Sequence, residues 1–180
     1  MKETETIGII GLGRMGGNLA LQALEKGYRV VGYDKAGATN ELIAAGLKNC
    51  LSLQELRENL PANCVIFIYV IAGPIVEDIL AETTKVLQPG DTVVDGGNSY
   101  WGDSLRRHQW LKAQGFNFID CGTSGGVEGA RNGACFMVGG EQEVVALFEP
   151  LFKSLAVPGG LCPCRPSGRR PLHKAGAQRD

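Results

Sequence analysis

The sequence predicts an α/β fold in which helices cover both faces of a doubly wound, mostly parallel sheet. Two observations lead to this expectation: apolar runs of strand length alternate with segments of helical periodicity, and a glycine-rich turn follows the first apolar run. The chain has 180 residues, 44% of them hydrophobic, which suits one ordinary domain with its own core.

The first half of the chain is expected to hold three strands and three helices. Residues 7–10 form an apolar run that predicts a buried strand, and residues 18–26 carry leucine and alanine at helical spacing before Gly27. A strand is expected at 29–33 and a helix at 39–45. Ser52 and Glu55 have capping-box spacing, which predicts a short helix to residue 60. Residues 64–71 are apolar throughout, as in a central strand covered on both faces.

The second half continues the alternation. Pro74 suits the first turn of a helix that runs toward residue 87, and residues 92–94 read as a buried strand. A helix is expected at 103–114, closed by Gly115, followed by strands at 116–120 and 135–138. Residues 141–154 predict a final amphipathic helix.

The glycine-rich turn joins the first expected strand to the first helix. Gly11 permits a tight turn, Gly13 lets the backbone approach a pyrophosphate, and Gly16 lets the helix pack closely on the sheet. The free N–H groups at the helix start attract phosphates. Because the motif follows a strand and opens a helix, we interpret it as a Rossmann-like dinucleotide site rather than a plain turn. The residues expected at the cofactor here are Gly11, Leu12, Gly13, Arg14, Met15 and Gly16.

An acidic residue ends the second expected strand, at the position where a carboxylate accepts hydrogen bonds from the adenosine ribose. Asp34 favours NAD, because it would repel the 2′-phosphate of NADP. Lys35 follows directly and would offset part of that repulsion. The residues therefore predict NAD or NADP, with both left open.

Small and polar residues follow three of the later strands, where ligands bind in such folds. Ile71 and Ala72 are expected beside the nicotinamide end of the cofactor, together with Asn98. Clusters of glycine with asparagine or serine are often plain turns, but two of them at strand ends of one sheet favour a binding role. The residues expected to bind a hydroxylated, carboxylate-bearing substrate are Asn98, Ser124, Gly125 and Gly126.

Composition argues against several other classes of function. The formal net charge is −1, so no global field recruits nucleic acid or an anionic membrane. No stretch is long enough to span a membrane, and the first residues lack the apolar core of a signal peptide. The six cysteines include no pair at the spacing of a zinc or redox site, so no metal is expected. A cytoplasmic setting is the expectation.

Three motifs together resemble 6-phosphogluconate dehydrogenase (decarboxylating). They are the glycine turn continued to Asn18, the element Asp95-Gly-Gly-Asn-Ser99 with Asp103 and Arg106-Arg107, and Gly122-Thr-Ser-Gly-Gly126. The resemblance runs from about residue 7 to residue 160. It implies an oxidoreductase of gluconate metabolism and the pentose phosphate pathway, which oxidises 6-phosphogluconate with NADP or NAD and releases CO2 to give ribulose 5-phosphate. It also implies that Asn98, Ser124, Gly125 and Gly126 bind the sugar acid. Many members carry Asn-Arg-Thr where this chain has Tyr33-Asp-Lys35, which weakens the case for strict NADP use.

The chain departs from that family after Gly160. The family's general base is a lysine in a Lys-x-Val-His-Asn-Gly segment, followed by a helical domain that supplies phosphate ligands and the homodimer interface. Neither the lysine segment nor the helical domain is recognised in residues 161–180, which are rich in Cys, Pro and Arg. No catalytic residue is therefore identified in this sequence. We therefore expect a dinucleotide-binding domain at 1–160 and an irregular tail at 161–180. Losing a general base typically costs about 10²–10⁴-fold in rate, so we expect cofactor binding with little turnover.

A reading-frame shift near Gly160 is one hypothesis for the departure. Codons permitted by the tail, read one nucleotide out of frame, give YAPAGPAGAGHFIKLVHNG, which contains the family's lysine segment. Sequencing the gene around this point tests that hypothesis. A flexible basic tail is the alternative.

Two functions compete with the phosphogluconate hypothesis. One is a dehydrogenase for another β-hydroxyacid, such as hydroxyisobutyrate, against which Asn98 and the two glycines before it argue. The other is a non-catalytic NAD(P)-binding module.

Overall fold

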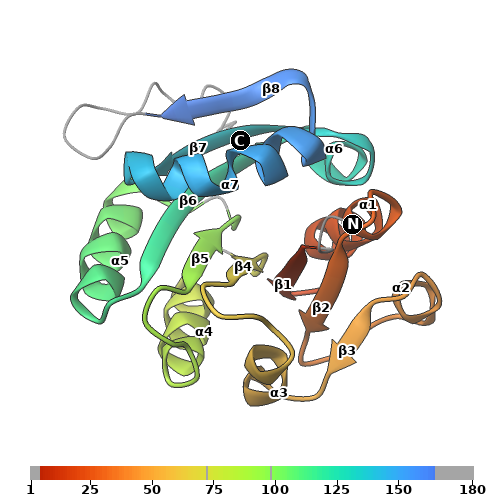
Figure 1. Ribbon diagram of the computed structural model, residues 1–180, viewed down its shortest axis with the longest axis horizontal. Helices are drawn as coiled ribbons and strands as arrows, with labels where there is room; N and C mark the ends of the chain where they lie inside the picture. The colour runs from red at the N-terminus through yellow and green to blue at the C-terminus, as the bar shows by residue number, and fades with distance from the viewer. Residues whose placement is uncertain (1–4, 72, 98, 165–180) are drawn as a thin grey trace.

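The structure, a computed structural model, describes residues 5–71, 73–97 and 99–164 and confirms the α/β fold (Figure 1). Within these residues one eight-stranded sheet has the order β3-β2-β1-β4-β5-β6-β7-β8. All neighbouring strands are parallel except β6 and β7, which run antiparallel. The strands are β1 (Thr6–Ile10), β2 (Arg29–Tyr33), β3 (Lys48–Cys50), β4 (Val65–Ile68), β5 (Thr92–Asp95), β6 (Asn117–Ser124), β7 (Ala134–Gly140) and β8 (Ala156–Cys164).

Helices lie on both faces of the sheet, as expected (Figure 1). They are α1 (Arg14–Glu25), α2 (Asn40–Ala44), α3 (Leu53–Glu58), α4 (Pro74–Thr84), α5 (Trp101–Ala113), α6 (Gly126–Asn132) and α7 (Gln142–Leu155). None of the helices in the described ranges is long and apolar enough to cross a membrane.

The core has two parts, one on each face, and β4 contributes to both. Val65 and Phe67 pack into the cluster that also holds residues of α1 and α7. Ile66 and Ile68 alternate with them and pack into the cluster that holds residues of α3, α4 and α5. All four side chains are at most 2% exposed, which confirms the expectation of a central strand covered on both faces.

Three elements were not expected from the sequence, and two expected helices begin earlier, α1 by four residues and α5 by two. β3 has only three residues, two of them polar, and α6 begins within a glycine cluster that reads as turns. α1 starts at Arg14 rather than at residue 18, because the end of the glycine motif is already helical.

The third unexpected element corrects the expected tail. β8 runs through Gly160 to Cys164 and pairs with β7, with Leu161 opposite Phe136 and Cys162 opposite Met137. Residues 161–164 are therefore not irregular, and pairing to a neighbouring strand orders them despite their Cys and Pro content. The remainder of the expected tail, 165–180, lies outside the described residues.

A buried ion pair holds the amino-terminal end of β5 against α3. Arg57 Nε lies 2.7 Å from Asp91 Oδ2, and the two side chains are 7% and 0% exposed. The Asp91 carboxylate also accepts the backbone N–H groups of Cys64 and Gln88. Asp91 therefore ties together the chain entering β4, the turn before β5 and a helix, with its charge compensated inside the protein.

Replacing Arg57 by methionine leaves the Asp91 carboxylate buried without its cation. We expect Arg57→Met to lower the free energy of unfolding by about 3–5 kcal/mol, measured by chemical denaturation. The matched control is Lys48→Met, which removes the exposed Lys48–Glu55 pair (N–O distance 3.5 Å) and should cost less than about 1 kcal/mol. Equal losses in the two variants would contradict a special role for the buried pair.

Candidate dinucleotide and substrate site

The loops that the sequence singles out meet at one edge of the sheet. β1, β4, β5 and β6 are parallel neighbours, and the register aligns Ile10 with Ile68, Ile68 with Asp95, and Asp95 with Asp120. The residues after these positions therefore emerge side by side at the carboxyl edge. β6 alone continues beyond this line, to Ser124.

Two glycines of the turn after β1 are required by the protein itself. Gly11 has φ +90°, and a Cβ there would lie 2.3 Å from the carbonyl oxygen of Tyr69. A Cβ on Gly16 would lie 1.9 Å from the carbonyl oxygen of Gly11. Both distances are shorter than atoms tolerate, so the tight turn and the close packing of α1 depend on these glycines.

Gly13 differs, because apart from its two chain neighbours no atom of the described residues lies within 4 Å of a Cβ built on it. Its φ of −69° is negative, so the left-handed strain that requires glycine at position 11 is absent here. No steric contact in the described fold therefore excludes a side chain at Gly13. The open space above Gly13 is the position where a pyrophosphate approaches the backbone in dinucleotide-binding turns.

The start of α1 faces this space. Gly13 is the N-cap and offers no side-chain cap, so the first N–H groups of the helix have neither a helical carbonyl nor a cap as partner. Gly13 and Arg14 are exposed and Met15 is half-buried. An anion at this helix start gains both hydrogen bonds and the favourable end of the helix dipole.

Asp34 lies directly beside the glycine turn. Its Oδ2 accepts the Leu12 N–H at 2.7 Å, and its Oδ1 accepts the Ala36 N–H at 2.8 Å. Leu12, expected at the cofactor, has its side chain 6% exposed in the core. Lys35 is exposed next to Asp34. The carboxylate thus fixes the turn and keeps acceptor capacity for further hydroxyl donors, because each oxygen accepts more than one bond.

A buried network holds the loop after β5. Asp95 Oδ1 accepts the Gly97 N–H at 3.0 Å, and Oδ2 accepts the Ser99 hydroxyl at 2.7 Å. Arg107 of α5 lies 2.8 Å from the same Oδ2 and also donates to Glu77 of α4. Gly97 and Ser99 flank Asn98 in sequence, and both are tied to Asp95. Asn98 itself and Ala72 lie outside the described residues.

The turn after β6 is the third part of the edge. Ser124, Gly125 and Gly126 are exposed, and both glycines have positive φ, +108° and +59°. A side chain is rarely stable at either angle, so glycine is required for this turn. Gly125 is the N-cap of α6 and has no side-chain cap. Exposed backbone N–H groups in such a turn suit a carboxylate. Ile71, expected near the nicotinamide, is 78% exposed at the same edge.

Sequence reasoning missed Tyr69, the residue that follows β4. Its side chain is 9% exposed, and its hydroxyl shares a 3.0 Å hydrogen bond with Thr123 Oγ1, one residue before Ser124. Burial raises the pKa of the Tyr69 phenol, so it stays protonated at neutral pH. The available signal was a hydroxyl-bearing ring near the end of an otherwise apolar run at a ligand-binding edge.

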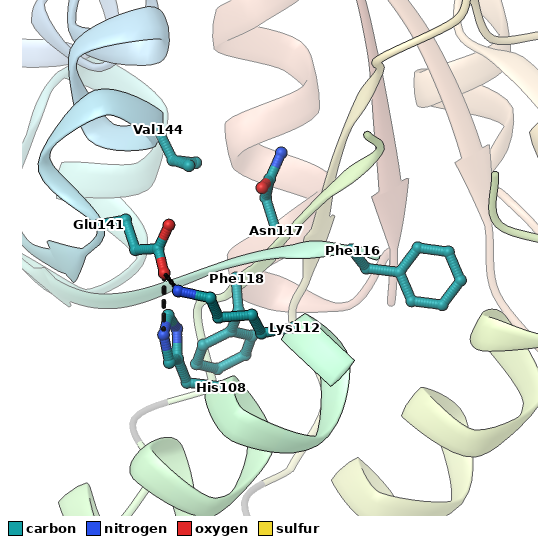
Figure 2. A pocket seen from close by; sticks show the side chains of 7 residues that line it. All are labelled: His108, Lys112, Phe116, Asn117, Phe118, Glu141 and Val144. Carbon is teal, nitrogen blue, oxygen red and sulfur yellow. Dashed lines mark hydrogen bonds and ion pairs between the residues drawn. The ribbon is translucent and has the colours of Figure 1, made fainter. Parts of the chain in front are cut away.

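Two hollows in the described surface lie away from this edge. One, of about 10 Å³, lies between α5 and the start of α7, where His108 and Lys112 face Glu141 (Figure 2). The other, of about 410 Å³, is lined by Asn63, Gly90, Thr92, Asn117, Leu147 and Phe148. Asn117 begins β6, so both lie toward its amino end. Neither includes a residue that the sequence predicted for the site.

A model of the family described as the NAD binding domain of 6-phosphogluconate dehydrogenase matches residues 6–164. The chain belongs to this family. Its members include oxidoreductases, and residues 161–164, at the end of the match, coincide with the end of β8.

Named relatives agree with the family. A Bacillus subtilis protein named putative 6-phosphogluconate dehydrogenase YqeC is 42% identical over 155 residues, covering 86% of this chain and 52% of the relative. The structure of Plasmodium falciparum 6-phosphogluconate dehydrogenase, determined in apo form, with NADP+ and with 6-phosphogluconate, has a TM-score of 0.77 at 29% identity. It matches over 89% of this chain and 36% of its own length.

A second solved structure shares the fold alone. Mycobacterium tuberculosis 3-hydroxyisobutyrate dehydrogenase has a TM-score of 0.81 at 24% identity, over 91% of this chain and 55% of its own. The chain thus spans about half the length of the Bacillus subtilis relative and about a third of the Plasmodium enzyme.

The contrast between two glycines gives a test of the cofactor turn. We expect Gly13→Ala to weaken dinucleotide binding by about tenfold or more, because its Cβ enters the pyrophosphate space, and to lower the free energy of unfolding by no more than about 1 kcal/mol, the cost of alanine at an N-cap. Gly16→Ala, the control, should instead lower the free energy of unfolding by about 1–3 kcal/mol through its clash with Gly11. Calorimetric titration and chemical denaturation separate the two effects. A Gly13→Ala variant that binds NAD+ normally would contradict this assignment.

Proposed function

We propose that this chain binds NAD+ at the glycine turn and presents a sugar acid of the 6-phosphogluconate class to it at the carboxyl edge of the sheet. The observation that carries the proposal is the space at Gly13. Beyond its chain neighbours, no described atom lies within 4 Å of a Cβ built on Gly13, and a pyrophosphate bound in that space accounts for a glycine at the start of α1. The named relatives and the Asp95–Ser99 and Gly122–Gly126 motifs support the sugar acid.

The preference for NAD+ over NADP+ rests on Asp34. Its carboxylate is fixed by two backbone N–H groups beside the turn, so it is unable to swing away from a 2′-phosphate without breaking both bonds. Lys35 is exposed and has no comparable fixed position. The fixed Asp34 carboxylate should repel a 2′-phosphate more strongly than the Lys35 ammonium attracts it, because water and salt screen the exposed lysine more strongly.

The roles of the chain's own residues follow from their chemistry. Bound NAD+ supplies the hydride acceptor. The exposed N–H groups of Gly125 and Gly126 suit the substrate carboxylate, and the Ser124 hydroxyl suits a substrate hydroxyl. Asn98 is predicted to bind the same substrate, together with Ser124, Gly125 and Gly126. The decarboxylating reaction as a whole is proposed on the strength of the longer relatives, and no residue described here is assigned as its general base.

Cofactor choice is tested with two substitutions. We expect the wild-type chain to bind NAD+ at least about tenfold tighter than NADP+, and Asp34→Asn to reduce that ratio by about tenfold while retaining an acceptor for Leu12. Lys35→Met is the control and should weaken NADP+ further without affecting NAD+. Calorimetric titrations of the wild type and the two variants with each cofactor measure all six affinities. Tighter binding of NADP+ to the wild type would refute the preference.

The substrate class is tested by nuclear magnetic resonance of the chain saturated with NAD+. We expect 6-phosphogluconate to shift the amide resonances of Ser124, Gly125 and Gly126, and 3-hydroxyisobutyrate to leave them unchanged at the same concentration. Ser124→Ala should weaken the response by about three- to tenfold, the worth of one hydrogen bond. Equal responses to the two acids, or none to 6-phosphogluconate, would count against the sugar acid.

A further inference from the structure

Tyr69 contacts the ends or loops of three strands that the site uses, β1, β5 and β6. Its backbone N–H donates to the carbonyl of Ile10 at 2.8 Å, which joins the ends of β4 and β1 just before the glycine turn. Its own carbonyl oxygen is the atom that a Cβ on Gly11 would strike at 2.3 Å. The main chain of Tyr69 is thus packed directly against the cofactor turn.

The ring of Tyr69 supports the loop after β5. A Cβ on Gly96 would lie 2.5 Å from Cε1 and 2.6 Å from Cζ of this ring, so Gly96 rests on the ring itself. The ring also stacks on Phe67, with planes 6° apart and centroids 6.4 Å apart. Phe67 is fully buried, so this contact fixes the ring from the core side.

The hydroxyl reaches the third loop. It shares its hydrogen bond with Thr123 Oγ1 in the part of β6 that extends beyond the parallel edge. β7 restrains this extension on the other side, with Phe136 opposite Thr123 and Cys135 opposite Ser124. The Tyr69–Thr123 bond therefore links the extension to β4, on the side where the cofactor turn lies.

We propose that Tyr69 is a positioning residue for the substrate, whose hydroxyl holds Thr123 and so sets the Ser124–Gly126 turn at a fixed distance from the glycine turn. This role rests on the proposed function, because it assumes a sugar acid at Ser124–Gly126 beside a cofactor. Tyr69 itself need touch neither ligand. Hydride transfer requires the two ligands to be held within a fraction of an ångström of the right separation, so a rigid spacer between their loops serves the reaction directly.

Tyr69→Phe isolates the hydroxyl. Phenylalanine keeps the ring under Gly96, the stack on Phe67 and the backbone contacts with Ile10 and Gly11, and removes only the bond to Thr123. We expect NAD+ affinity within about twofold of wild type and 6-phosphogluconate affinity, measured with NAD+ present, about three- to tenfold weaker. Thr123→Val should give the same loss of 6-phosphogluconate affinity, whereas Thr123→Ser, which keeps the hydroxyl, should retain wild-type affinity. The Tyr69→Phe, Thr123→Val double variant should bind 6-phosphogluconate no more weakly than either single variant.

Tyr28→Phe is the matched control, because the Tyr28 hydroxyl also bonds a hydroxyl, that of Ser154 at 2.7 Å, but outside the site. It should leave both affinities unchanged. Wild-type sugar-acid affinity in Tyr69→Phe, or an equal loss of NAD+ and sugar-acid affinity, would overturn the positioning role and leave the proposed function intact. A wild-type chain that binds NAD+ but no sugar acid would instead overturn the proposed substrate, and the positioning role with it.

Discussion

The close approach of the glycine turn to the end of β4 is the constraint on which the rest of the site depends. Gly11 lies against the carbonyl of Tyr69, and Gly16 lies against the carbonyl of Gly11, with no room for a Cβ at either position. These two contacts bring the start of α1 onto the carboxyl edge. Once α1 is held there, its free N–H groups and the open position at Gly13 face outward together. Asp34 then fixes the turn from the β2 side through the Leu12 N–H.

The central strand β5 is held at both ends by a buried acid paired with an arginine from a helix. Asp91 and Arg57 form the pair at the amino end, and Asp95 and Arg107 form the one at the carboxyl end. The first pair serves the fold alone. The second also bonds Gly97 and Ser99, so the same charge that anchors α5 shapes the loop that contains the predicted substrate residue Asn98. Fold and site therefore share this interaction, and a change at Asp95 affects both.

Most of the fold was predictable because many of its strands are apolar runs and several of its helices end at a glycine or begin with a cap. β3, α6 and β8 were missed for physical reasons: three residues are too few for periodicity, and glycine-rich or proline-containing segments gain order only from their neighbours. The glycine motif predicted a separate role for each of Gly11, Gly13 and Gly16, and the space around each glycine differs in the way those roles require. The sequence also pointed to Asp34, which lies beside the turn. The role of Tyr69 was not predicted from the sequence, because Gly96 and Thr123 are brought to the Tyr69 side chain only by the register of three strands.

The most direct test of the account is an experimental structure of this chain with NAD+ bound. We expect pyrophosphate oxygens to lie within hydrogen-bond distance of the N–H groups at the start of α1, above Gly13, and the adenosine ribose hydroxyls to bond Asp34. The nicotinamide should then lie between the end of β4 and the Ser124–Gly126 turn. A dinucleotide bound elsewhere, such as in the hollow lined by Asn63, Asn117 and Phe148, with Gly13 still open, would contradict it.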